Sequence, residues 1–150
     1  MRTLRPATDH DCPRLSAVAR AAKAHWGYPQ AWLDLWVADL TYDASRLADE
    51  RVLCAEDGGE VVGFVAWRRD GEEAEIEGLW VEPGAMGRGH GRALMEAASV
   101  AARAEGVRAL RIVADPNAVE FYRRLGAVDV GAEASVPAGR ELPVLRLELG

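Results

Sequence analysis

The sequence predicts an α/β protein in which a mixed, mostly antiparallel central sheet is flanked by helices on both sides. First, the spacing of apolar residues switches along the chain between the helical period and the alternation of strands. Second, the turn signals Asp57-Gly58-Gly59 and Asp70-Gly71 join strand-like runs as hairpins. Third, a glycine-rich turn leads from a strand directly into a helix. Hairpins followed by alternating strands and helices are typical of a mixed sheet whose first half is antiparallel.

The expected elements follow the order β-α-α-β-β-β-α-β-α-β-β. The first helix begins at Asp9 or Asp11, has Pro13 near its first turn, and breaks at residues 25–29. The second helix carries apolar residues at helical spacing, namely Trp32, Leu35, Trp36 and Leu40. The expected strands cover about residues 2–7, 51–56, 60–68, 74–82, 110–114, 127–135 and 142–149.

Two further helices are defined by their end signals. One runs from Gly89 to Arg103 and stops at Gly106. The other follows Asp115, which is an N-cap placed before a first-turn proline, and ends at Gly126. No linker or repeat divides the chain, so we expect residues 1–150 to form one domain.

Composition excludes several function classes. The net charge of −6 offers no basic field for nucleic acid, and no apolar run is long enough to span a bilayer. Cys12 and Cys54 form no paired motif, and His10, His25 and His90 have no zinc-ligand spacing. We therefore expect a cytoplasmic protein without a metal and without nucleic-acid or membrane partners.

The glycine-rich turn at residues 84–91 is the most informative segment. Glycines allow a close approach of the backbone to a ligand, and the first amides of the following helix favour an anion. A Walker loop is excluded because His90-Gly91 stands where Lys and Ser or Thr are needed. The dinucleotide-binding motif GxGxxG is also excluded. After Gly87 and Gly89 it needs a glycine at position 92, but the next glycine is Gly91. A phosphate cradle and a connection without a ligand both remain open.

These residues resemble the GNAT superfamily of N-acetyltransferases, in which a strand ending in L-x-V-x-P precedes [QR]-x-x-G-x-[GA]. Leu79, Val81 and Pro83 match the strand, and Gly89 and Gly91 match the two glycines. Met86 stands where the family has Gln or Arg, a side chain that usually braces the pyrophosphate loop.

A second segment, from Asp115 to Ala127, resembles the family motif N-x-x-A-x-x-[FL]-Y-x-x-x-G-F. Its Ala, aromatic, Tyr and Gly positions match, while Asn117 is shifted by two residues and Ala127 replaces the final Phe. The resemblance covers nearly the whole chain and implies the GNAT fold, with acetyl-CoA as co-substrate. The residues it implies for coenzyme A are Leu79, Trp80, Val81, Met86, Gly87, Arg88, Gly89, His90, Gly91 and Arg92, with Asn117 and Arg123 as further candidates.

Acetyl transfer to an amine needs a base and gains from an acid. Glu75 and Glu77 stand two apart on one strand and are expected to face the same side of the sheet. By resemblance, Glu75 lies where several members carry their base, while Glu77 could act directly or through water. Tyr122 matches the general-acid tyrosine of the family. Solvated carboxylates and a core tyrosine are the alternatives.

The acceptor site is expected near the first two helices. His25, Trp26 and Tyr28 lie in the loop between them, and aromatic side chains with polar tips suit a small amine. Trp32 and Trp36 fit packing on the sheet at least as well. The sequence thus predicts an N-acetyltransferase for a primary amine on a small molecule or peptide, with a second copy of the chain as a candidate partner. A non-catalytic acyl-CoA-binding module is the alternative, which Met86 keeps open.

Overall fold

The computed structural model describes residues 1–150 and contains one seven-stranded sheet in the order β1-β2-β3-β4-β5-β7-β6. Only β4 and β5 run parallel, and every other neighbouring pair is antiparallel. The expected mixed sheet is therefore confirmed. The strands are β1 (Arg2–Pro6), β2 (Arg51–Asp57), β3 (Glu60–Asp70), β4 (Glu73–Val81), β5 (Ala109–Val113), β6 (Val128–Ala134) and β7 (Glu141–Glu148).

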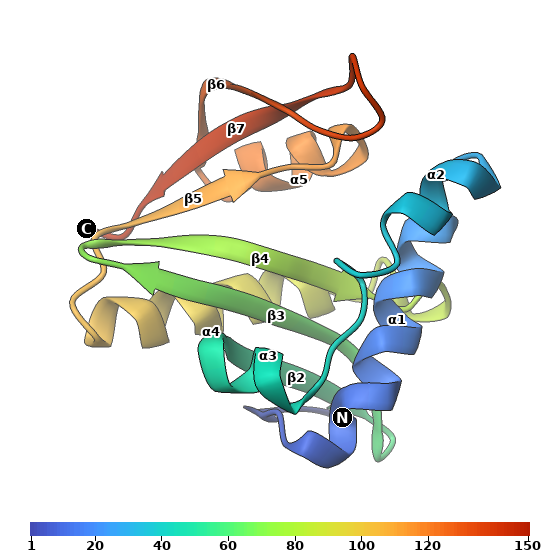
Figure 1. Ribbon diagram of the computed structural model, residues 1–150. Helices are drawn as coiled ribbons and strands as arrows, with labels where there is room; N and C mark the ends of the chain where they lie inside the picture. The colour runs from blue at the N-terminus through green and yellow to red at the C-terminus, as the bar shows by residue number, and fades with distance from the viewer.

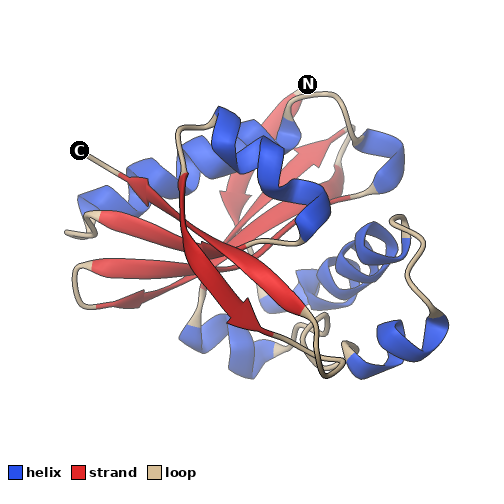
Figure 2. Ribbon diagram, turned by 90° about the horizontal axis from the view of Figure 1, so that it is seen from above, coloured by secondary structure: helices blue, strands red, loops and turns tan.

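Helices cover both faces of the sheet (Figure 2). They are α1 (Cys12–Ala24), α2 (Gln30–Leu35), α3 (Ala44–Asp49), α4 (His90–Ala104) and α5 (Val119–Arg124), with 3-10 turns η1 (Asp9–Asp11), η2 (Pro83–Ala85) and η3 (Pro116–Ala118). None of the helices is long and apolar enough to cross a membrane.

Two details of the helices differ from the expectation. The second helix is shorter than expected, because α2 ends at Leu35 and a turn carries Trp36 and Leu40 into the core. The short helix α3 was not predicted, although Asp43 caps it by accepting a hydrogen bond from the Arg46 amide at 2.9 Å. No α3 residue is fully buried, so the helix lacks the apolar stripe that reveals longer helices.

The sheet separates two apolar clusters. On one face, α4 and α5 pack against β3–β5, with Leu94, Leu110 and Ile112 fully buried. On the other face, α1 places Leu15 and Val18 against Phe64 of β3. The spacing of three or four residues along α1 explains why one side of this helix is buried.

The sheet opens between its two parallel strands. The β4–β5 ladder ends at the pair Ile76↔Ile112, and beyond it the two strands diverge (Figure 1). The residues of β4 from Glu77 to Val81 still pair with β3 in part but have no partner on the β5 side. The end of β4 therefore offers a free backbone edge inside the sheet.

A β-bulge at Glu77 sets which side chains face this opening. Ala66 pairs with Gly78 and Trp67 with Ile76, so Glu77 is the extra residue of β4. A Cβ on Gly78 would lie 3.2 Å from the hydroxyl of Tyr42, which belongs to the α1-side cluster. The bulge thus reverses the alternation of β4, and Leu79 and Val81 pack on the α4 side instead.

Candidate active site

Six successive backbone amides are free at the start of α4. The amides from Gly87 to Arg92 donate no hydrogen bond within the chain, and the first bond of the helix runs from the Ala93 amide to the Gly89 carbonyl at 3.1 Å. Unpaired amides at a helix N-terminus, with the helix dipole behind them, bind phosphate groups. Such a row of donors is what the phosphate cradle, one of the two interpretations of the turn, requires.

Glycine conformations shape the cradle. Gly87 and Gly89 have φ values of +80° and +83°, a region that residues with a side chain rarely adopt. Gly91 contributes differently, because a Cβ there would lie 3.3 Å from the ring of Phe121 on α5. Gly91 therefore lets α4 and α5 approach each other while its own amide stays free.

Arg2 ties the cradle to the first strand. Its Nη2 donates to the Arg88 carbonyl at 2.8 Å, and its Nε donates to Nδ1 of His90 at 3.0 Å. The His90 ring is buried beside β1, and burial, reinforced by the nearby Arg2 charge, lowers the pKa of His90. His90 can therefore serve the cradle through its amide, while its ring anchors the loop. Sequence analysis missed Arg2, which lies 88 positions from its partner His90.

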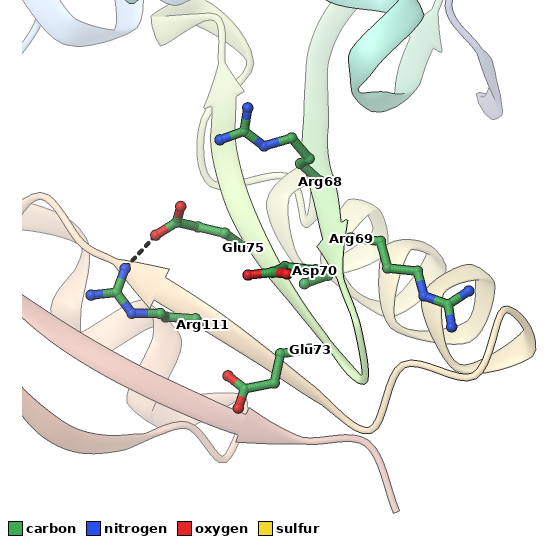
Figure 3. A pocket seen from close by; sticks show the side chains of 7 residues that line it. Arg68, Arg69, Asp70, Glu73, Glu75 and Arg111 are labelled. Atoms are coloured by element: carbon green, nitrogen blue, oxygen red, sulfur yellow. Dashed lines mark hydrogen bonds and ion pairs between the residues drawn. The ribbon is translucent and has the colours of Figure 1, made fainter.

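The two candidate bases differ in their surroundings. Arg111 of β5 forms ion pairs with both Glu75 and Glu133, and Figure 3 shows the Glu75 side chain pointing toward Arg111. The side chain of Glu77 is only 20% exposed. Arg68 Nη2 lies 3.1 Å from its Oε1, but the angle is not that of a hydrogen bond, so this buried oxygen accepts none.

The electrostatic setting of Glu77 favours proton uptake. Burial raises the pKa of Glu77, Arg68 opposes the rise, and the neighbouring Glu50 and Glu75 add to it. A carboxylate with a raised pKa is a stronger base near neutral pH.

Tyr122 lies on α5 in the larger apolar cluster and is 6% exposed. Its hydroxyl makes no hydrogen bond within the chain. Burial, reinforced by the negative charge of Asp115, raises the pKa of Tyr122. The phenol therefore keeps its proton at neutral pH and is present in the form that can act as a proton donor.

A buried charged cluster is built around Asp115, just after the end of β5. Lys23 Nζ donates to Asp115 Oδ2 at 2.6 Å, and the Tyr28 hydroxyl contacts Asp115 at 2.9 and 3.0 Å. Arg140, from the β6–β7 connection, donates to the Tyr28 hydroxyl at 3.1 Å. The indole of Trp36 lies beneath both cations, 4.5 Å from Lys23 Nζ and 4.6 Å from Arg140 Cζ.

This cluster forms one wall of a cavity of about 350 Å³. Both candidate bases line it, together with apolar side chains from four parts of the chain. The lining residues are Lys23, Trp36, Asp39, Leu40, Arg46, Glu75, Ile76, Glu77, Trp80, Val113, Asp115, Glu133, Ser135, Arg140 and Leu142. A charged hollow of about 490 Å³ on β3–β5 shares Glu75 with it (Figure 3).

Some of the other expected site residues lie in the charged cluster, and others lie on the exposed surface. Tyr28 joins the charged cluster, while His25 and Trp26 pack edge to face at 5.1 Å on the exposed surface and do not line the cavity. Asn117 donates its side-chain amide to Tyr28 at 3.2 Å and to Asp115 at 2.9 Å. The exposed Arg123 pairs with Glu120 and with Asp129.

Most residues of the cavity were missed by sequence analysis as site residues, among them Lys23, Asp115 and Arg140. Lys23 gave a signal, because it follows Leu15, Val18 and Ala22 on the buried side of α1, where a lysine is unusual. Asp115 was recognised only as a cap, and Arg140 gave no signal.

Comparison with known proteins assigns the family. The family model "Acetyltransferase (GNAT) family" matches residues 17–127, and the chain belongs to this family. The candidate site thus belongs to a protein of an acetyltransferase family.

One curated relative matches part of the chain. An uncharacterised N-acetyltransferase of Methanocaldococcus jannaschii is 40% identical over 81 residues, which are 47% of this chain and 36% of that protein. The chain thus matches only about a third of that curated relative.

Two solved structures share the fold. The paiA N-acetyltransferase of Thermoplasma acidophilum, in complex with coenzyme A, has a TM-score of 0.77 at 16% identity and 99% coverage of both chains. The yncA protein of Salmonella typhimurium, with its cofactor acetyl-CoA, has a TM-score of 0.73 at 23% identity, covering 100% of this chain and 95% of that one.

Proposed function

We propose that this protein transfers the acetyl group of acetyl-CoA directly to a primary amine. The observation that carries the proposal is the row of six free amides at the start of α4, beside the unpaired edge of β4. The amides suit the pyrophosphate of coenzyme A. The edge residues Leu79, Trp80 and Val81 suit the amide-containing pantetheine arm, which can pair with them as a strand would.

Glu77 is the proposed general base. The acceptor binds mostly as an ammonium ion, which has no lone pair for attack. Glu77 takes one proton from it, and the freed nitrogen lone pair forms a C–N bond with the thioester carbonyl carbon. Glu77 is favoured over Glu75 because its buried oxygen accepts no hydrogen bond and its pKa is raised, whereas Arg111 donates a hydrogen bond to Glu75. Arg68 lies 3.1 Å from the same oxygen of Glu77 as an ion pair.

Tyr122 is the proposed general acid. When the tetrahedral intermediate collapses, the C–S bond breaks and its electron pair stays on sulfur. Tyr122 donates its proton to that sulfur and recovers one from the nitrogen, while Glu77 releases its proton to solvent. The products are the N-acetyl amine and coenzyme A with a free thiol.

The test is thiol release from acetyl-CoA with a panel of primary amines, together with mass spectrometry of the acetylated product. We expect release that depends on both the amine and the protein. Calorimetric binding of coenzyme A without thiol release for any amine would instead indicate an acyl-CoA-binding module. No binding at all would overturn the cradle.

A further inference from the structure

The charged cluster in the cavity wall contains two cations, Lys23 and Arg140, but only one carboxylate, that of Asp115. Lys23, Asp115 and Arg140 have side chains that are only 10%, 10% and 11% exposed. Asp115 already accepts hydrogen bonds from Lys23, from Tyr28 and from both the backbone and side-chain amides of Asn117. Its carboxylate is thus saturated, mainly by Lys23.

Arg140 is the cation without a full partner. A guanidinium has five N–H donors, yet its side chain makes one hydrogen bond, to the Tyr28 hydroxyl. The nearest carboxylate oxygen, on Asp115, is 3.8 Å away. A mostly buried charge is unfavourable unless it is paired and hydrogen-bonded. The remaining donors of Arg140 therefore suit an anion in the cavity, and the planar guanidinium matches a carboxylate.

Two carboxylates of β4 line the same cavity. Glu77 and Glu75 line it from β4, and no hydrogen bond or ion pair joins either of them to Lys23 or Arg140. The lining also contains the apolar residues Trp36, Ile76, Trp80, Val113 and Leu142, and the charged residues Asp39, Arg46 and Glu133. The cavity thus combines a guanidinium that can bind a carboxylate with carboxylates that can bind an ammonium group, the two charged groups that share one carbon in a free amino acid.

We infer that the acceptor is a free amino acid, whose carboxylate binds Arg140 while its amine faces Glu77. This inference rests on the proposed function and names its substrate class. The cavity of about 350 Å³ is in the size range of small-molecule sites. A peptide N-terminus lacks the adjacent carboxylate, because that group is tied up as an amide.

Matched acceptors test the inference. Leucine, leucinamide, isopentylamine and the dipeptide Leu-Gly share a side chain or amine but differ in the adjacent carboxylate. We expect kcat/KM for leucine to be about 10- to 100-fold higher than for the other three, the range for a charged hydrogen bond. Leucinamide is the sharpest comparison, because its less basic amine supplies more free base and would otherwise react faster.

Arg140 variants show whether this residue causes the preference. Arg140→Gln should lower kcat/KM for leucine about 10- to 100-fold and change that for isopentylamine less than about threefold. Arg140→Lys keeps the charge and should retain part of the preference for leucine. It replaces Arg140→Gln in this test if the Gln variant does not fold. Arg108→Gln, at an arginine that is 78% exposed, is the matched control and should retain the full preference.

The outcomes separate the inference from the proposed function. Turnover of amines without a preference for leucine, or a preference for Leu-Gly, overturns the inference and leaves the proposed function standing. If no amine is acetylated, the proposed function fails. Calorimetric titration of leucine into the coenzyme A complex then decides the inference. Binding that Arg140→Gln weakens at least tenfold supports it, and no binding, or equal binding, overturns it.

Discussion

Lys23 at the end of α1 and Asp115 at the end of β5 form a buried ion pair, with Nζ and Oδ2 2.6 Å apart. The two residues are 92 positions apart in the sequence. Their contact joins the helix on one face of the sheet to the strand that diverges from β4. It therefore fixes one wall of the cavity as well as the packing of α1.

Replacing Asp115 with Asn should destabilise the fold by about 3–5 kcal/mol, because Lys23 would keep a buried charge without its partner. Burial lowers the pKa of Lys23, so the variant can fold with a neutral lysine. Deprotonation of Lys23 costs about 1.4 kcal/mol less for each unit by which the pH rises. The deficit should therefore be larger at pH 7 than at pH 9.5. Urea unfolding at both pH values measures this.

The exposed Asp49 provides the control for that experiment. Asp49→Asn should change the unfolding free energy by no more than about 0.5 kcal/mol at either pH. A deficit in Asp115→Asn that grows with pH would contradict the charge argument, since it would place the defect outside Lys23.

Substitution of Gly89 by Val should weaken coenzyme A binding about tenfold or more, with a smaller effect on folding. Gly89 adopts φ +83° and lies within the row of free amides at the start of α4, so a side chain there shifts the donors. Gly71→Val is the matched control, because Gly71 has φ +65° in the open β3–β4 turn. Calorimetric titration should show unchanged affinity for the control. Equal affinities in all three proteins would reject the cradle.

Arg2→Met should lower coenzyme A affinity about 3- to 10-fold, because the loop loses two hydrogen bonds that hold Arg88 and His90. Met86→Gln alone should leave the affinity unchanged or improve it, since it adds a hydrogen-bonding group. Combined with Arg2→Met, it should restore part of the loss. Arg20→Met, on the outer side of α1, is the control. A marked loss in Met86→Gln would show that Met86 packs in a role of its own.

Tyr122→Phe should reduce turnover about 10- to 1,000-fold, the range for general acid–base catalysis, with little change in either KM. The melting temperature should change little, because the hydroxyl has no hydrogen-bond partner in the chain. Initial rates of thiol release measure the effect. Unchanged turnover, in a reaction limited by chemistry, would leave Tyr122 as a packing residue.

Glu77→Gln should reduce kcat/KM about 100-fold near neutral pH, and the loss should shrink as pH approaches the amine pKa. The raised pKa of Glu77 places the acid limb of the wild type above the ordinary glutamate value of about 4.3. Below this pH range Glu77 is protonated and cannot act as a base, so activity is lost as the pH falls through the pKa of Glu77. Glu75→Gln should keep the limb. A limb that disappears in Glu75→Gln instead would assign the base to Glu75.

Much of the fold could be read from local patterns, and the exceptions share a cause. The hairpins, the helix starting at Gly89 and the short helix after Asp115 all follow from residues within a few positions of one another. Helix α3 and the shortened α2 were misjudged, because tertiary packing buries Trp36 and leaves α3 without a buried side.

The sequence by itself determined the class of site. The glycines at 87, 89 and 91 and the strand before them form one local motif, and Tyr122 belongs to a second. These motifs carry the resemblance from which the roles of their residues are predicted. The β-bulge at Glu77 was not predictable, because a bulge depends on the register with β3. That bulge decides which β4 side chains face the cavity.

Only the tertiary structure decided which charged side chains line the cavity. Lys23, Asp115 and Arg140 come from α1, the end of β5 and the β6–β7 connection, and their contacts span 92 and 112 positions for Lys23–Asp115 and Tyr28–Arg140. Arg2 reaches His90 across 88 positions. Local patterns arise from backbone geometry, which repeats every two to four residues. The pairing of distant charges depends on which elements the folded sheet brings together, and no spacing in the sequence encodes it.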